Sequence, residues 1–287
     1  MAGSFLKWAG GKARLARRIS EALPAGVARY HEPFLGGGAV FFALQQAGQT
    51  PWARLSDTNG ELVECFGVVR DRPDDLTESL AVHSEAYLPG SHEARTAYFL
   101  AQRACRPADA VARAARLIFL NRTCYNGLYR VNASGQFNVP HGRYANPRIV
   151  DREGIGAASV ALRCTELSTD DFGTACERAR PGDFVYLDPP YYPLSATSNF
   201  TDYTSGAFGP AEHERLRDAF EALTRRGVHA MLSNSKAPFV EALYAGHGYR
   251  VAEVTMSRAI NSVGAKRAPI AELLVDNFER VGRAPGL

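Results

Sequence analysis

The sequence predicts an α/β fold in which a mostly parallel sheet is interrupted by an inserted helical module. Short apolar runs alternate with amphipathic helical patterns near both ends of the chain. The apolar run from Phe184 to Leu187 has the character of a buried parallel strand. Between residues 72 and 149, helical patterns follow one another with no strand among them. These observations divide the chain into a sheet domain, residues 1–71 and 150–287, and an insertion, residues 72–149.

Composition narrows the class of protein. The 287 residues are 46% hydrophobic and 22% charged, which is typical of an ordinary globular protein. There is no apolar run of membrane-spanning length and no signal-peptide pattern, so we expect a cytoplasmic protein with no membrane partner. The five cysteines are widely spaced and form no C-x-x-C pair, so neither a disulfide framework nor a metal site is expected.

The first candidate ligand contact is the run from Lys7 to Lys12. It contains Trp8 and Gly10, and glycines let the backbone approach a ligand closely. The run is not a Walker loop, because Leu6 stands where the first glycine would be needed. A helix from Ala13 to Leu23 is expected next.

A strand, a glycine turn and a helix follow, at residues 30–35, 36–38 and 39–44. This is the layout of a nucleotide-cradling turn. The pattern is not G-x-G-x-x-G, because Phe41 stands in the place of the last glycine, so a dinucleotide fits poorly.

The next expected strand, residues 52–56, ends at Asp57. An acid at this place commonly accepts hydrogen bonds from ribose hydroxyls. The alternative is a helix N-cap, a role for which Thr58 and Asn59 also compete. With the glycine turn and no pyrophosphate fingerprint, the acid favours a mononucleoside cofactor, and S-adenosylmethionine is the natural candidate.

The middle of the chain is basic and helical. Helices are expected at residues 60–71, 74–85, 92–105 and 109–121, and a β-hairpin with a Gly-containing turn within residues 122–144. Nine arginines and one acid lie between Arg95 and Arg148, which is an electrostatic footprint for a polyanion. The alternatives are arginines that only cover a helical surface and a hairpin that only caps the helices.

After residue 149 the alternation of strand and helix returns. Strands are expected at the end of 160–167 and at 184–187, 228–234, 249–256 and 270–275, helices at 170–180, 211–226 and 238–245, and long polar loops at 193–210 and 257–269.

Asp188 follows the buried strand 184–187 directly, and two prolines follow the acid. Ligands of open α/β sheets bind at the carboxyl ends of the strands. The prolines have no N–H, so the segment offers acceptors, and Tyr191 adds a flat face. An amine-bearing ring such as a nucleobase would suit this arrangement, whereas the plainer alternative is a strand followed by a proline-rich turn.

Taken in order, these motifs resemble the Dam-type DNA adenine N6-methyltransferases of the D12 class, over nearly the whole chain. The order of cofactor motif, recognition module and catalytic motif is that of the alpha group. The motifs are Phe5-Leu6-Lys7-Trp8-Ala9-Gly10-Gly11-Lys12, Glu32-Pro33-Phe34-Leu35-Gly36-Gly37-Gly38, Asn126-Gly127-Leu128-Tyr129-Arg130-Val131-Asn132 with Phe137-Asn138-Val139-Pro140, and Asp188-Pro189-Pro190-Tyr191.

The resemblance implies a Rossmann-like class I methyltransferase sheet with residues 72–149 as target-recognition domain. It implies transfer of a methyl group from S-adenosylmethionine to N6 of a flipped-out adenine in double-stranded DNA, within GATC, by a monomer in the cytoplasm of a bacterial or phage-infected cell. The catalytic residues would be Asp188, Pro189, Pro190 and Tyr191. The cofactor-binding residues would be Trp8, Gly10, Lys12, Glu32, Phe34, Gly36, Gly38, Asp57 and Asp188. The DNA-binding residues would be Lys7, Tyr125, Asn126, Leu128, Arg130, Asn138, Pro140 and Tyr144.

Two other interpretations of the residues stay open at this point. One is a methyltransferase acting on protein glutamine amides or RNA adenines, because a carboxamide also fits the Asp188 motif. The other is a DNA-binding module that keeps the fold without turnover. The basic hairpin speaks against a protein substrate, and the intact Asp188 and glycine turn speak against loss of catalysis.

Overall fold

The computed structural model describes residues 3–8, 13–50, 52–194, 208–256 and 270–279. In these ranges seven strands form one sheet in the order β3-β2-β1-β4-β5-β7-β6. The pairs β1–β2, β1–β4 and β4–β5 are parallel, and β7 runs antiparallel to both β5 and β6. The predicted α/β sheet, Rossmann-like and mostly parallel, is therefore confirmed. The strands are β1 (Tyr30–Glu32), β2 (Ala53–Ser56), β3 (Thr165–Ser168), β4 (Phe184–Leu187), β5 (His229–Ser235), β6 (Arg250–Met256) and β7 (Ile270–Asp276).

The chain divides into two compact units, and each is described by itself. The first unit comprises Met1–Ala22, Leu35–Pro51 and Asp57–Thr169. The second unit comprises Leu23–Phe34, Trp52–Ser56 and Asp170–Leu287. The division into a recognition domain at 72–149 and a catalytic domain around it stays a prediction.

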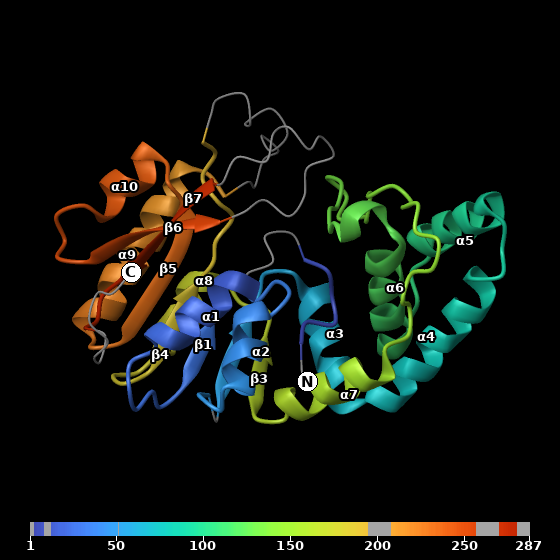
Figure 1. The fold of residues 1–287 in the computed structure, drawn as a ribbon, viewed down its shortest axis with the longest axis horizontal. Helices are drawn as coiled ribbons and strands as arrows, with labels where there is room; N and C mark the ends of the chain where they lie inside the picture. Colours follow the sequence, from blue (N-terminus) through green and yellow to red (C-terminus); the bar gives the residue numbers. More distant parts are fainter. Residues whose placement is uncertain (1–2, 9–12, 51, 195–207, 257–269, 280–287) are drawn as a thin grey trace. The chain divides into compact units, whose positions relative to one another are not determined.

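The first unit is mainly helical, and α6 packs against α3, α4 and α5 (Figure 1). Ten of the fourteen residues of α6 are buried, because the helix packs against α3 and α4. Side chains fix the starts of four of its helices, α3, α5, α6 and α7, where Asn59, Ser91, Asp109 and Asp151 accept backbone N–H groups of the first turn. The helices are α1 (Ala13–Ala22), α2 (Ala39–Gln46), α3 (Gly60–Asp71), α4 (Pro73–Tyr87), α5 (His92–Ala104), α6 (Ala110–Thr123) and α7 (Arg152–Leu162).

The core of the second unit lies on β4 and β5. All four residues of β4 are buried, as expected for a strand with neighbours on both sides. Leu216, Phe220 and Val240 cover the sheet from α9 (Pro210–Arg225) and α10 (Pro238–Tyr244). This core fixes the end of β4, from which Asp188 emerges.

One helix is shorter than its pattern predicts. The expected helix at 170–180 is α8 (Phe172–Glu177). The Asp171 side chain accepts from the Gly173 N–H and caps the start of α8. At the other end, the Asp183 carboxylate accepts the Arg180 N–H and bends the chain into β4. The polar loops expected at 193–210 and 257–269 lie largely or wholly outside the described residues.

None of the helices in the described ranges has the length and apolar character needed to span a bilayer. Among the same residues, no group of three or more His, Cys, Asp or Glu side chains is placed to hold a metal ion.

Candidate active site and nucleic-acid interface

The glycine turn of the first unit (Gly36 to Gly38) has a backbone that favours glycine. Gly36 and Gly38 have φ angles of 47° and 65°, in the left-handed region. A Cβ atom on Gly36 would lie 2.8 Å from Nε1 of Trp8, and one on Gly37 would lie 2.8 Å from Cβ of Trp8. Trp8 therefore lies directly on the turn, at the point where the chain enters α2.

Asp57 is bound to this turn. Its Oδ2 accepts the Gly36 N–H at 3.0 Å and its Oδ1 accepts the Asn59 N–H at 3.0 Å. The N-cap of α3 is Asn59, whose side chain accepts the Leu62 N–H at 3.3 Å, so Asp57 does not cap that helix. Burial raises the pKa of Asp57, and the backbone hydrogen bonds oppose that rise. A carboxylate has about four acceptor sites, so beside its backbone hydrogen bonds Asp57 keeps capacity to accept from a ligand hydroxyl.

Four further residues were predicted to bind the cofactor. Gly10 and Lys12 lie outside the described residues. Glu32 and Phe34 belong to the second unit. Glu32 is buried and accepts the Tyr30 hydroxyl at 2.8 Å, and Phe34 stacks on Phe172 with a ring separation of 5.3 Å.

Asp188 stands at the carboxyl end of β4, as the sequence predicts. Its Oδ1 accepts the Ser233 hydroxyl at 2.7 Å. The Tyr186 hydroxyl lies 2.8 Å from the same Ser233 oxygen. Because the single Ser233 proton is donated to the carboxylate, Tyr186 must be the donor in the second bond. Burial raises the pKa of Tyr186 well above its ordinary value, which keeps this donor protonated.

The residues after Asp188 are also held in place. The Tyr191 hydroxyl donates to Oε2 of Glu272 at 2.9 Å. Burial, followed by the nearby carboxylates of Asp188 and Glu272, raises the pKa of Tyr191, so its hydroxyl stays protonated. The Tyr192 N–H donates to Oδ1 of Asn234 at 3.1 Å.

Sequence reasoning missed Ser233, Asn234 and Glu272. The signal for the first two was present, since three small polar residues end the apolar run of β5 beside Asp188. Glu272 had no such signal, because it lies on β7, which pairs with β5 in the antiparallel direction.

On the recognition side of the first unit, Lys7 is fixed by its own backbone. Its N–H donates to Oδ1 of Asn121 at 2.8 Å, and Nδ2 of Asn121 donates to the Lys7 and Gly127 carbonyls at 2.7 and 3.1 Å. The Lys7 ammonium lies 4.2 Å from the centre of the Tyr144 ring. Burial, with repulsion from Arg122, lowers the pKa of Lys7. The role of Asn121, a fully buried residue near the end of α6 that holds the Lys7 backbone, was not predicted from the sequence.

The predicted β-hairpin forms only in part. In the described chain its pairing consists of two isolated antiparallel bridges, Cys124 with His141 and Val131 with Phe137. The 3-10 turn at Tyr125–Gly127 interrupts the first arm, and this is why no continuous ladder forms.

The proposed DNA-binding side chains line this segment. Tyr125 is 48% exposed, and its N–H donates to the Pro140 carbonyl at 2.9 Å. Asn126 is exposed with a φ of 55°, and Leu128 is half-buried. The exposed Arg130 donates from Nε to Oδ1 of Asn138 at 2.7 Å. Tyr125, Asn126 and Arg130 therefore remain accessible to a ligand, while Asn138 orients Arg130.

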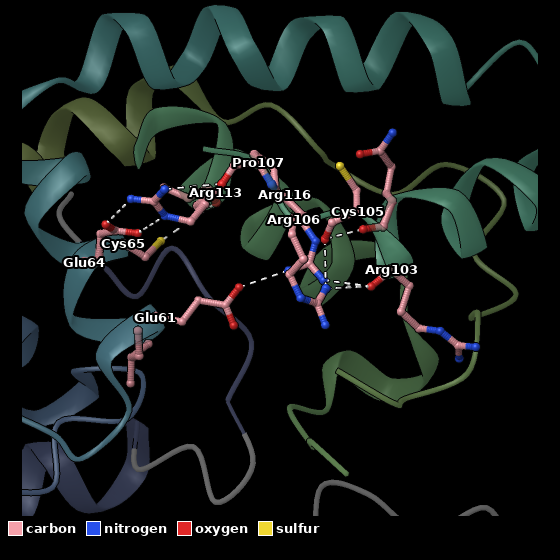
Figure 2. A network of polar contacts seen from close by, with 12 residues as sticks. Glu61, Glu64, Cys65, Arg103, Cys105, Arg106, Pro107, Arg113 and Arg116 are labelled. Carbon is pink, nitrogen blue, oxygen red and sulfur yellow. Dashed lines mark hydrogen bonds and ion pairs between the residues drawn. The ribbon is translucent and has the colours of Figure 1, made fainter. Parts of the chain in front are cut away.

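The arginine block is only partly a free basic surface. Arg113 and Arg116 form ion pairs with Glu64 and Glu61 at 2.6 and 3.0 Å (Figure 2). Arg122 donates to the Phe5 carbonyl at 2.8 Å. The polyanion footprint therefore applies to the hairpin region more than to α6, where the arginines hold the fold.

Comparison with known proteins identifies the family of this chain. The model of the family described as D12 class N6 adenine-specific DNA methyltransferase matches residues 8–260. The chain belongs to this family. As a D12 class adenine-specific DNA methyltransferase it is an enzyme and its substrate is DNA. This excludes both alternatives left open by the sequence, a protein or RNA methyltransferase and a module without turnover.

Relatives of the D12 class enzyme cover almost all of it. It is 41% identical over 282 residues to a Type II methyltransferase of Lactococcus lactis subsp. cremoris, covering 96% of this chain and 95% of the relative. It is also 41% identical over 286 residues to a Type II methyltransferase of Methanocaldococcus jannaschii, covering 96% and 98%. Identity to the DNA adenine methylase of Escherichia coli (strain K12) is 34% over 273 residues, covering 94% of each chain.

Proposed function

We propose that this enzyme transfers a methyl group from S-adenosylmethionine to N6 of an adenine that has left the DNA duplex, within GATC. The observation that carries the proposal is Asp188. Its carboxylate ends a buried strand, is fixed by Ser233 and is followed by a segment without N–H donors at Pro189 and Pro190. This is an acceptor site built to hold an amine.

The proposed role of Asp188 follows from the chemistry of adenine. The N6 lone pair is delocalised into the ring, so the amine is a poor nucleophile. Acceptors at Asp188 and at the Pro189 carbonyl hold its two hydrogens and favour a pyramidal nitrogen. Because positive charge develops on that nitrogen as it is methylated, these hydrogen bonds strengthen in the transition state.

The residues of the first unit fit an adenosine-containing cofactor. The glycine turn is backbone-lined and covered by Trp8, and the Asp57 carboxylate beside it has acceptor capacity for ribose hydroxyls. In this proposal Trp8, Gly36, Gly38 and Asp57 hold the cofactor. S-adenosylmethionine supplies a methyl group on a sulfonium, which is a good leaving group.

Recognition of the target is proposed for the hairpin and Lys7. A guanidinium such as that of Arg130 can donate two hydrogen bonds to O6 and N7 of guanine. The exposed Tyr125 ring offers a stacking face beside the position from which the adenine leaves. The GATC sequence follows from the resemblance of this hairpin to the Dam-type recognition motif. Tyr191 is proposed to stack on the extruded base.

Three further proposals follow from the same assignment. Residues 72–149 form the target-recognition domain, the enzyme acts as a monomer, and it works in the cytoplasm of a bacterial or phage-infected cell. The names of its relatives fit either a restriction–modification enzyme or a methylase that acts alone.

A methylation assay with labelled S-adenosylmethionine tests the proposal. Methylation rates are measured on duplexes that contain GATC or one of its single-base variants with adenine at the target. Fluorescence is measured on a matching GATC duplex in which 2-aminopurine, which has no N6 to methylate, replaces the target adenine. We expect methyl transfer to GATC above all variants, and a rise in 2-aminopurine fluorescence on binding, since extrusion unstacks the base. Equal rates on all duplexes would exclude GATC, and unchanged fluorescence would exclude base flipping.

A further inference from the structure

Glu61 holds together two parts of the first unit that are distant in sequence. It lies in the first turn of α3 and is only partly exposed. Its Oε1 accepts the Arg116 guanidinium of α6 at 3.0 Å, and its Oε2 accepts the Tyr129 hydroxyl at 3.2 Å. Figure 2 shows the carboxylate of Glu61 directed at Arg116. No motif of the sequence included Glu61, and Arg116 was only one of the nine arginines of the basic stretch.

Arg116 fixes Glu61 rigidly. Arg116 is 4% exposed and also donates to two carbonyls at the end of α5, from Nε to Gln102 at 2.8 Å and from Nη2 to Arg103 at 2.8 Å. A buried guanidinium whose hydrogen bonds are satisfied in this way has little freedom to move. The Glu61 carboxylate is therefore a fixed acceptor for Tyr129.

Tyr129 lies between the proposed cofactor and DNA sites. Its ring stacks on Trp8, with centres 5.2 Å apart and planes inclined by 21°. It also makes a T-shaped contact with the Phe137 ring of the recognition hairpin, with ring centres 5.9 Å apart. Burial raises the pKa of Tyr129 to about 12, so its hydroxyl stays protonated and remains a donor to Glu61.

The contacts close into a ring within the first unit. Trp8 lies on Gly36 and Gly37, and the Gly36 N–H binds Asp57. Asp57 in turn binds the N–H of Asn59, the residue that caps α3 and stands two positions before Glu61. A displacement of Trp8 by a ligand is thus opposed by Tyr129, and a displacement of Tyr129 by DNA acts on Trp8.

We propose that Glu61, acting through Tyr129, is a positioning residue that couples cofactor binding at the glycine turn to DNA binding at the recognition hairpin. The inference rests on the cofactor and DNA sites proposed above. Coupling of this kind is reciprocal: DNA tightens cofactor binding by the same factor by which the cofactor tightens DNA binding.

The same helix provides a matched control. Glu64 lies one turn after Glu61 on α3 and pairs with Arg113 of α6, at 2.6 and 2.7 Å (Figure 2). Both pairs join α3 to α6. The hydrogen bonds of the Glu64 pair run to Arg113 and do not include the Tyr129 hydroxyl, which Glu61 accepts. Loss of an α3–α6 ion pair can therefore be separated from loss of the Tyr129 contact.

The test is titration calorimetry with S-adenosylhomocysteine, which has no methyl group to transfer, in the absence and presence of a GATC duplex. The ratio of the two Kd values is the coupling factor. We expect Tyr129→Phe and Glu61→Gln each to lower this factor by roughly three- to tenfold. The first removes the hydroxyl that donates to Glu61, the second neutralises the carboxylate that accepts from Tyr129 and Arg116, and both keep the rings and the overall size. Glu64→Gln should leave the factor unchanged.

Three results would overturn the inference. They are a coupling factor of one in the parent enzyme, an unchanged factor in Tyr129→Phe, and equal losses in Glu61→Gln and Glu64→Gln. Asp57→Asn separates this failure from failure of the proposed cofactor site. If Asp57→Asn weakens binding of S-adenosylhomocysteine while Tyr129→Phe leaves the factor unchanged, only the inference fails. If Asp57→Asn binds as the parent does but Tyr129→Phe lowers the factor, the role of Asp57 fails and the coupling stands.

Discussion

Replacing Asp188 by asparagine separates its chemical role from its structural one. The side chain keeps its size and one oxygen, so it can still accept the Ser233 hydroxyl that now lies 2.7 Å from Oδ1. The bond loses its charge assistance, which is worth about 1 kcal/mol for a hydrogen bond of this kind. The Tyr186–Ser233 bond is unaffected, so we expect the melting temperature to change by only a few degrees.

The effect on methyl transfer should be much larger. In Asp188→Asn the second acceptor becomes an NH₂ group, which repels the substrate amine that the carboxylate is proposed to hold. Removing one preorganised hydrogen-bond partner of the transition state typically costs about 2.7–4 kcal/mol, or roughly 10²–10³ in kcat. Because the loss belongs to the transition state, the Kd values for DNA and cofactor should change little.

Single-turnover methylation of a GATC duplex with labelled S-adenosylmethionine measures this loss. Thermal unfolding and DNA binding of the same samples confirm that the variant is folded. Ser233→Ala is the companion variant: it leaves the carboxylate in place and removes the hydrogen bond from Ser233, so we expect a loss of about tenfold, smaller than in Asp188→Asn. A folded Asp188→Asn enzyme within threefold of the parent rate would refute the assignment of Asp188.

Three further outcomes are expected. Arg130→Ala should cost about 1–3 kcal/mol of discrimination at one guanine of the target, measured as methylation rates on single-base variants; an equal loss on every duplex would make Arg130 a phosphate contact instead. Gly36→Ala should weaken cofactor binding by roughly tenfold in calorimetry, because φ is 47° and the added Cβ would lie 2.8 Å from Nε1 of Trp8. Gly67→Ala is the control and should bind the cofactor normally, because a Cβ added at this position inside α3 meets no atom within 4 Å outside the helix's own backbone. Burial lowers the pKa of His213 to about 4, against about 6.5 when unfolded, so the folded state loses up to about 3 kcal/mol relative to the unfolded state as pH falls from 6.5 to 4. His213→Leu should therefore reduce the difference in unfolding free energy between pH 7.5 and pH 4.5, measured by chemical denaturation; an unchanged difference would contradict this reasoning.

The local elements of this enzyme could be predicted from its sequence. The four-residue apolar run of β4 and the prolines after Asp188 set the limits of that strand, and both are properties of neighbouring residues. The same holds for α3 to α6, whose amphipathic patterns and N-terminal polar residues lie within each segment. The position of Asp188 at a sheet edge therefore follows from the residues on either side of it.

The partners of the site residues could not be predicted in this way. Asn121 binds Lys7 across 114 positions, and Ser233 reaches Asp188 across 45. Nor could the sequence show that Asn59 caps α3 while the Asp57 carboxylate binds the Gly36 N–H, 21 positions earlier. Periodicity reports which face of a segment is buried, but it does not report what that face meets.

The arginines show the same division most clearly. The sequence alone shows a basic stretch, and its count of charges predicted a polyanion as binding partner. Only the packing of α6 on α3 decided that Arg116 is buried against Glu61 while Arg130 stays exposed on the hairpin. A side chain's charge is fixed by its type, but whether that charge is paired within the fold or offered to a ligand depends on which segments the hydrophobic core brings together.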